Sequence, residues 1–146
     1  MSRRFNLAEA QSLIPQVDQL LRVAIAQKAE FQEADQAVQA ISQRVTLMGG
    51  MMIDRDQAVD TRRRRDSMAT KLRASIEEVE GFGCVIKDLD IGLIDFPTLL
   101  RGVEVYLCWK LGESKIAFWH GIDEGFRGRK AIDQDFREHH RGDRAQ

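Results

Sequence analysis

The chain has almost no net charge, few cysteines and no long apolar run. Its 146 residues carry 22 Lys and Arg against 23 Asp and Glu, a formal net charge of −1, so no global field draws the protein to nucleic acid or anionic lipid. No run approaches the ~18 apolar residues of a membrane span, and the N-terminus lacks an apolar core of signal-peptide length. These absences favour a cytoplasmic protein with no membrane partner.

Strong chemical signatures are also missing. Two cysteines, Cys84 and Cys108, do not make a disulfide framework, and a reducing compartment would keep them as thiols. The sequence contains neither Cys-x-x-Cys nor HExxH, and the glycines between Gly121 and Arg129 match neither the Walker loop nor the dinucleotide fingerprint. Candidate functional residues must therefore be argued from local patterns.

The first half of the chain is built as helix. Asn6 and Glu9 form a capping box that starts a helix near Leu7. Pro15 either kinks this helix or opens a new one, and we favour a break between a short helix and a longer one. From there apolar residues follow a seven-residue repeat that only Gln27 interrupts. The members of this stripe are Val17, Leu20, Ala24, Phe31, Ala34, Val38, Ile41, Val45 and Met48.

A second helix is predicted from Gln57 to Glu80, after a glycine turn at Gly49 and Gly50. Returning antiparallel, it makes a helical hairpin whose tip is near Gly50. The arginine run 62–65 is interleaved with aspartates, which favours a salt-bridged helix face over nucleic-acid binding. Because the apolar stripe is longer than one domain covers, we expect a homodimer through helices 17–48 and 57–80.

After Gly83 the pattern becomes that of a small antiparallel sheet of about three strands. Segments rich in β-branched and aromatic residues predict strands at 84–86, 103–111 and 116–120, with a loop at 87–97. An even-length turn between the last two strands keeps their apolar residues together on one face. That register places Trp109 and His120 on one face and Cys108 on the other.

Together these elements predict an α+β fold, a long antiparallel helical hairpin packed with a small antiparallel sheet. One domain spans residues 1–132, with the helical part at 7–83 and the sheet with its loops at 84–132. The polar C-terminal tail, residues 133–146, either frays or docks through Phe136.

Metal binding is one candidate chemistry. Ligand types occur at Cys108, His120, Asp123, Glu124 and the pair His139–His140, and the short spacing of His120 and Glu124 makes these two the candidate metal ligands. The predicted register separates Cys108 from His120. The competing interpretation makes Cys108 a small buried strand residue and His120 a hydrogen-bonded strand end.

Acid–base chemistry and anion binding are the other candidates. The carboxylates Asp88, Asp90 and Asp95, with Asp123 and Glu124, could divide acid and base roles around His120. Alternatively, these aspartates cap turns and pair with Lys87, Arg127 or Arg129. The same two arginines, set among glycines, are also able to hold a phosphate or carboxylate.

Three blocks, KDLDIGLIDFP, EVYLCWKLGE and FWHGIDEGFRGR, together with FNLAEAQSLIPQV at the start, resemble an uncharacterised prokaryotic family, domain-of-unknown-function family 2203. The resemblance extends to about Ile132. It implies no reaction, substrate or catalytic residue, but it directs attention to residues inside the blocks. These are Lys87, Asp88, Asp90, Asp95, Cys108, Trp109, Glu113, Trp119, His120, Glu124, Arg127 and Arg129.

The function favoured by the sequence is a non-enzymatic binding or scaffolding protein that dimerises through its helices and presents a polar motif surface. The alternative is a small metal-assisted hydrolase or lyase that uses His120 and nearby carboxylates. The sequence names no small-molecule or protein partner. The candidate site comprises Lys87, Asp88, Asp95, Trp119, His120, Glu124, Arg127 and Arg129.

Overall fold

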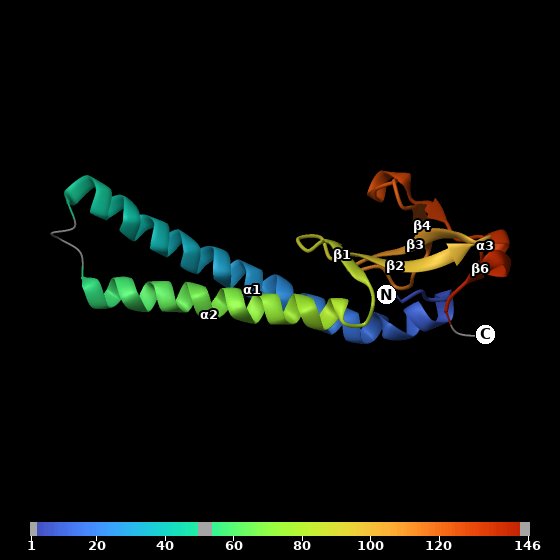
Figure 1. The fold of residues 1–146 in the computed structure, drawn as a ribbon, viewed down its shortest axis with the longest axis horizontal. Coiled ribbons are helices and arrows are strands. Elements are labelled where there is room, and N and C mark those ends of the chain that lie inside the picture. Colours follow the sequence, from blue (N-terminus) through green and yellow to red (C-terminus); the bar gives the residue numbers. More distant parts are fainter. Residues whose placement is uncertain (1–2, 50–53, 144–146) are drawn as a thin grey trace. The chain divides into compact units, whose positions relative to one another are not determined.

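A computed structural model describes residues 3–49 and 54–143 (Figure 1). The fold is α+β, as predicted, but the sheet has six strands among these residues rather than about three. The elements in order are α1 (Leu7–Met48), α2 (Arg55–Glu80), β1 (Val85–Asp88), β2 (Leu93–Leu100), β3 (Val103–Lys110), β4 (Phe118–Gly121), η1 (Phe126–Gly128), β5 (Lys130–Ala131), α3 (Gln134–His139) and β6 (His140–Arg141).

The described residues divide into two compact units. The hairpin unit comprises Arg22–Ile76, and the sheet unit comprises the residues before and after it. None of the helices in the described part of the chain is long and apolar enough to cross a membrane.

The start of α1 has the predicted capping box, but the predicted break at Pro15 is wrong. Asn6 Oδ1 accepts from the Glu9 amide (2.7 Å), and the Asn6 amide donates to Glu9 Oε1 (3.0 Å). The helix then continues through Pro15. Pro15 is exposed, whereas Ile14 and Val17 beside it are buried, so core packing on the other helix face outweighs the lost backbone bond.

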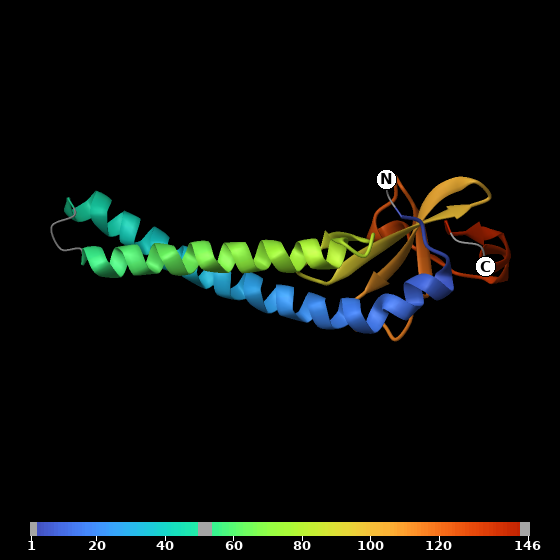
Figure 2. The same ribbon diagram turned by 60° about the horizontal axis from the view of Figure 1, so that its bottom comes forward.

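In the hairpin unit the two helices run antiparallel, as predicted, and they lie side by side in both views (Figures 1 and 2). Ser75 Oγ donates to Gln27 Oε1 (2.5 Å), so the residue that interrupts the apolar stripe has a polar partner on the other helix. Nearer the tip, Arg65 Nη1 lies 3.7 Å from Asp35 Oδ1. Gly49 adopts φ +64° where α1 ends, and the predicted tip at Gly50 lies outside the described residues.

The sheet has the order β1-β2-β3-β4-β5, with β6 added beside β2. Strand β2 takes up residues 93–97, the second part of the segment that its glycine and aspartates led us to predict as a loop. A proline is unusual in a central strand. In the structure β1 pairs with residues 93–95 of β2, with Val85 opposite Asp95, while β6 pairs with Leu99 and Leu100. Pro97 falls between these two partners, and the Phe5 amide donates to its carbonyl (2.7 Å). No amide hydrogen is needed from residue 97 there.

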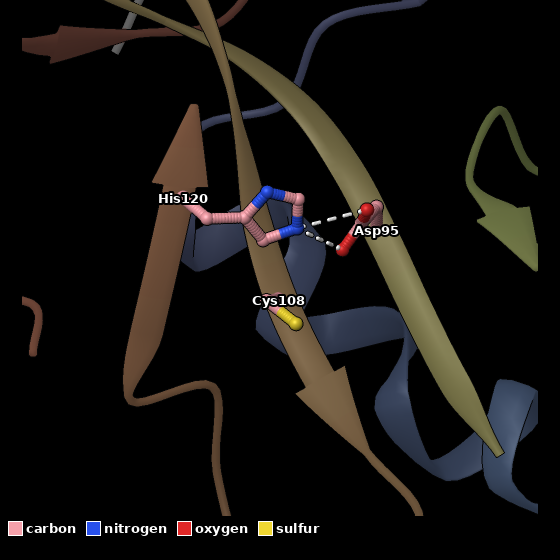
Figure 3. A group of neighbouring side chains, drawn as sticks. All are labelled: Asp95, Cys108 and His120. Atoms are coloured by element: carbon pink, nitrogen blue, oxygen red, sulfur yellow. Dashed lines mark hydrogen bonds and ion pairs between the residues drawn. The ribbon is translucent and has the colours of Figure 1, made fainter. Parts of the chain in front are cut away.

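The predicted register of the last hairpin is also wrong. Strands β3 and β4 pair Tyr106 with His120 and Cys108 with Phe118, so these four residues share a face. Residues 111–117 form a longer connection than a tight turn, and the amide of Ile116 donates to Gln11 Oε1 (2.8 Å) instead of joining the ladder. Figure 3 shows Cys108 and His120 on the same side of adjacent strands.

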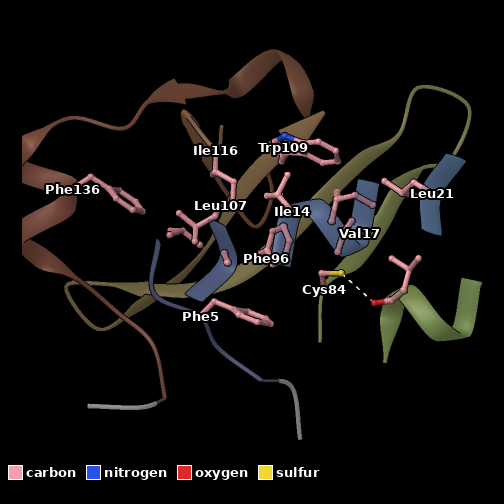
Figure 4. Close-up of a cluster of buried hydrophobic side chains, with 14 residues drawn as sticks. Phe5, Ile14, Val17, Leu21, Cys84, Phe96, Leu107, Trp109, Ile116 and Phe136 are labelled. Carbon is pink, nitrogen blue, oxygen red and sulfur yellow. Dashed lines mark hydrogen bonds between the residues drawn. The ribbon is translucent and has the colours of Figure 1, made fainter. Parts of the chain in front are cut away.

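One face of the sheet packs against the first turns of α1 (Figure 4). The hydrophobic core between them includes Phe5, Ile14, Val17, Leu21, Ile94, Phe96, Leu107, Trp109, Ile116 and Phe136. Phe136 comes from α3, so the C-terminal segment docks through it, one of the two predicted alternatives. Nearby, the amide of Leu7 donates to His140 Nε2 (2.9 Å), which ties the end of the described chain to the start of α1.

Candidate metal centre

The face of the sheet opposite the core carries three ligand-type side chains. Asp95 on β2 pairs with Cys108 on β3, and Tyr106, two residues before Cys108, pairs with His120 on β4. Strand alternation therefore brings Asp95, Cys108 and His120 together (Figure 3). One ligand atom from each lies within 4.8 Å of the others. The three residues are only 0%, 0% and 3% exposed, respectively.

The hydrogen bonds of His120 fix where its protons lie. Nδ1 is 2.8 Å from the carbonyl oxygen of Gly121, which can only accept, so Nδ1 carries a hydrogen. Nε2 is 2.9 and 3.0 Å from the two carboxylate oxygens of Asp95. One further proton must therefore lie between the imidazole and the carboxylate, and the pair has no net charge whichever group holds it.

The third member of the cluster is a protonated thiol. Burial raises the pKa of Cys108 to about 12, the Asp95 carboxylate adds to the rise, and the Arg129 guanidinium opposes it. Burial also raises the pKa of Cys84 to about 12. However, Cys84 lies in the hydrophobic core and donates to the Val79 carbonyl (3.3 Å), as Figure 4 shows. The two cysteines thus have similar acidity and different surroundings.

A carboxylate, a thiolate and an imidazole form a set suited to zinc and to other first-row divalent ions that accept sulfur. Tetrahedral zinc, with bonds of about 2.0–2.3 Å, needs ligand atoms roughly 3.5 Å apart, so a small inward movement of the cluster suffices. The Nδ1–H of His120 donated to the Gly121 carbonyl is the second contact that commonly orients a metal-bound histidine.

Arg129 and Glu113 lie close to this cluster. Arg129 Nη2 donates to both Glu113 carboxylate oxygens (2.7 and 2.8 Å), and its guanidinium carbon lies 4.0 Å from the Phe118 ring centroid. Glu113 Oε1 also accepts from the Lys110 amide (2.7 Å). Arg129 is therefore held in place by β3, β4 and their connection, where its charge lowers the pKa of Cys108.

The remaining predicted residues have other partners. Lys87 lies over the Tyr106 ring (4.7 Å), which contacts the His120 ring (5.5 Å between centroids). Asp88 Oδ1 accepts from the Asp90 amide in a turn (3.0 Å). Trp119 points away from the cluster and packs against Phe136, with ring centroids 5.2 Å apart, while Arg127 is exposed in η1.

Glu124, the predicted metal partner of His120, belongs to a different cluster. Lys130 Nζ lies 2.7 and 2.8 Å from its carboxylate oxygens, and the Gly121 amide donates to it (3.1 Å). The hydrogen bond from Lys130 lowers the pKa of Glu124, with a smaller contribution from the Gly121 amide. The structure thus brings His120 together with Asp95 and Cys108, while Glu124 closes the turn that follows β4.

Comparison with known proteins gives a family and no function. Residues 3–132 match the family described as "Uncharacterized conserved protein (DUF2203)", and Asp95, Cys108 and His120 all lie within the match. No curated protein and no solved structure is significantly similar to the chain. The resemblance carried by the three sequence blocks is confirmed, and the chain belongs to the DUF2203 family.

Proposed function

We propose that this chain is a metal-binding protein that holds one divalent cation, with zinc the best fit, between Asp95, Cys108 and His120. The observation that carries the proposal is the convergence of three different ligand types, all buried, from three adjacent strands. Asp95 and His120 are already paired with each other. A cation would replace that pairing and give all three side chains, the Cys108 sulfur included, a common partner.

Charge balance favours a divalent ion. Before binding, the cluster is neutral: it contains a thiol and an imidazole–carboxylate pair that shares one proton. Binding through all three ligands would release the thiol proton and the shared proton, and two negative ligands would then face two positive charges. The buried site keeps the same net charge, so it avoids the large desolvation cost of an unpaired charge.

The proposed ion has a structural or regulatory role. Three protein ligands leave the fourth tetrahedral position open, as in hydrolytic zinc sites, but the three side chains are at most 3% exposed, which leaves little access for a substrate. We therefore favour a binding protein, in which the ion joins β2, β3 and β4, over the metal-assisted hydrolase or lyase. Two free buried thiols fit a reducing compartment such as the cytoplasm.

Self-association of the hairpin unit is a second proposed property. Four apolar residues near its tip are exposed: Val45 (42%), Leu47 (81%), Met48 (53%) and Val59 (46%). Two of them, Val45 and Met48, continue the seven-residue stripe beyond Ile41, the last stripe residue that is buried. A stripe of this kind fits a second copy of the same helix, which supports the expected homodimer and a scaffolding role.

Metal content and titration test the first proposal. We expect protein purified without a histidine tag to hold one zinc per chain, and the metal-free protein to bind cobalt(II) with a near-ultraviolet thiolate charge-transfer band. Cys108→Ala and His120→Gln should abolish the band. Cys84→Ala and His139→Gln are matched controls outside the cluster and should keep it.

The pH dependence sharpens this test. Each proton released on binding makes the affinity rise about tenfold per pH unit. The Cys108 thiol, with a pKa raised to about 12, must lose its proton to bind the metal, so the affinity should rise at least about tenfold per unit between pH 6 and pH 8. Full affinity in Cys108→Ala, an affinity independent of pH, or no binding by the wild-type chain would each refute the proposal. Circular dichroism of each variant separates lost ligands from lost fold.

A further inference from the structure

The geometry points to a second binding site, for a small organic anion with an apolar body. A cavity of about 650 Å³ lies in the sheet unit, within the usual size range of small-molecule sites. It is formed by the first turns of α1, the connection between β3 and β4, and the region of α3. Its lining residues are Asn6, Leu7, Ala8, Gln11, Lys115, Ile116, Arg137 and His140. None of the metal ligands lines it, so this site is independent of the metal centre.

The charge of the cavity is positive and unbalanced. Lys115 and Arg137 line it, and neither side chain has an acidic partner among the described residues. No lining residue is acidic. The nearby carboxylate of Glu9 is held by the Asn6 amide (3.0 Å), and that of Asp133 caps α3 through the Phe136 amide (2.8 Å). An anionic group is therefore the complement that the cavity lacks.

The wall of the cavity is largely apolar. Leu7, Ala8 and Ile116 supply hydrocarbon surface, and the amides of Leu7 and Ile116 already donate to His140 Nε2 and Gln11 Oε1. A ligand therefore gains from an apolar body at the wall and from a charged group near the two cations. This arrangement fits an aryl or short-chain carboxylate better than a sugar or a free polyphosphate.

His140 contributes shape and no charge in this structure. Its Nδ1 lies 3.1 and 3.0 Å from the carbonyl oxygens of Phe136 and Arg137, so that nitrogen carries the hydrogen. Its Nε2 accepts from the Leu7 amide, which requires a free lone pair. The imidazole is therefore neutral here, and anion recognition depends on Lys115 and Arg137.

Three probes test the two halves of the expected ligand. 4-Phenylbutyrate has the apolar body and the carboxylate, 4-phenylbutanol has only the body, and acetate has only the carboxylate. In amide chemical-shift titrations we expect phenylbutyrate to shift the amides of Leu7, Ala8, Ile116 and Arg137. Phenylbutanol should bind at least about threefold more weakly, the scale of an exposed ion pair, and acetate should not saturate. No saturable binding of phenylbutyrate, or equal binding of phenylbutanol, would overturn the site.

Variants test its position. Arg137→Gln and Lys115→Gln should each weaken phenylbutyrate at least about threefold, while Arg73→Gln, an exposed arginine of α2, should leave its affinity unchanged. Ala8→Phe places a ring in the cavity and should abolish binding. Gln16→Phe, also exposed on α1 but outside the cavity, should not. Wild-type affinity in Arg137→Gln and Lys115→Gln, or in Ala8→Phe, would refute the assignment even if the probe binds elsewhere.

Discussion

The two units of this chain differ in composition and are stabilised differently, because both tryptophans, the tyrosine and every phenylalanine except Phe31 lie in the sheet unit. The fully buried side chains of the sheet unit include Trp109, Phe5, Phe96 and Phe136. The hairpin unit buries smaller groups in a narrow seam, chiefly Ala24, Ala34, Val38, Ile41 and Met68. Because apolar burial stabilises in proportion to area, most of the folding free energy resides in the sheet unit.

Polar contacts do not compensate in the hairpin unit. The pair of Asp35 with Arg65 is about one-third exposed on each side, and such ion pairs contribute about 0–1 kcal/mol. Five large apolar side chains of this unit remain exposed: Val23, Val45, Leu47, Met48 and Val59. We therefore expect the hairpin unit to open locally while the sheet unit stays folded.

The largest expected effect comes from truncating one large side chain in each unit. Phe96→Ala should lower the free energy of unfolding by about 3–5 kcal/mol, whereas Met68→Ala should cost about 2 kcal/mol, the low end for a buried methionine. Native-state hydrogen exchange distinguishes the two. Phe96→Ala should speed exchange throughout β2 and β3, and Met68→Ala only within Arg22–Ile76. Equal spread of both effects over the whole chain would show that the units unfold as one.

The same division explains what could be predicted from the sequence. In the hairpin unit a helix is stabilised by neighbours three and four residues away along the chain. The seven-residue stripe and the glycines at its end were therefore sufficient to predict two antiparallel helices. Gln27 was the one irregularity, and its partner Ser75 lies 48 residues away. The predicted break at Pro15 was wrong because the low helix propensity of proline takes no account of the burial of Ile14 and Val17.

The site depended on register, which the sequence specifies less directly. A one-residue change in the β3–β4 connection moves every later side chain to the other face. Ile116 was assigned to the last strand because it is apolar. In the structure it lies in the connection between β3 and β4, and its side chain is buried in the core from there. Counting Ile116 as a strand residue gave the wrong register, which placed Cys108 and His120 on opposite faces. Asp95 was among the candidate residues, but it was placed in a loop because glycine and aspartates punctuate the segment, whereas it lies in β2.

A smaller effect should appear at alkaline pH, and only in the sheet unit, because both cysteines lie there. The pKa of each thiol is raised to about 12 from an ordinary 9.0, so above pH 9 the unfolded chain loses thiol protons that the folded chain keeps. Stability present below pH 9 is therefore lost as pH rises toward 12, by about 1 kcal/mol per thiol between pH 9 and pH 10. Urea unfolding at both pH values measures it.

Two comparisons identify the source of that alkaline loss. Cys108→Ala should remove about half of it. Bound zinc should do the same, because a metal-bound thiolate has no proton to retain. An unchanged pH dependence in Cys108→Ala would mean that this thiol is already ionised or exposed in the folded protein.

The smallest effect on stability should come with the largest effect on assembly. Leu47, 81% exposed near the hairpin tip, contacts little within its own chain, so Leu47→Glu should change the free energy of unfolding by no more than about 0.5 kcal/mol. If a second copy covers the exposed end of the stripe, the same change places a carboxylate in that interface and should convert a dimeric mass to a monomeric one in light scattering.

Val103→Glu is the matched control, since Val103 is 63% exposed in the sheet unit and its substitution should leave the mass unchanged. A wild-type chain that is monomeric at micromolar concentration would contradict the dimer directly. In that case the hairpin unit would be a marginally stable arm whose apolar end no second copy covers, and the difference in stability between the two units would be larger than proposed.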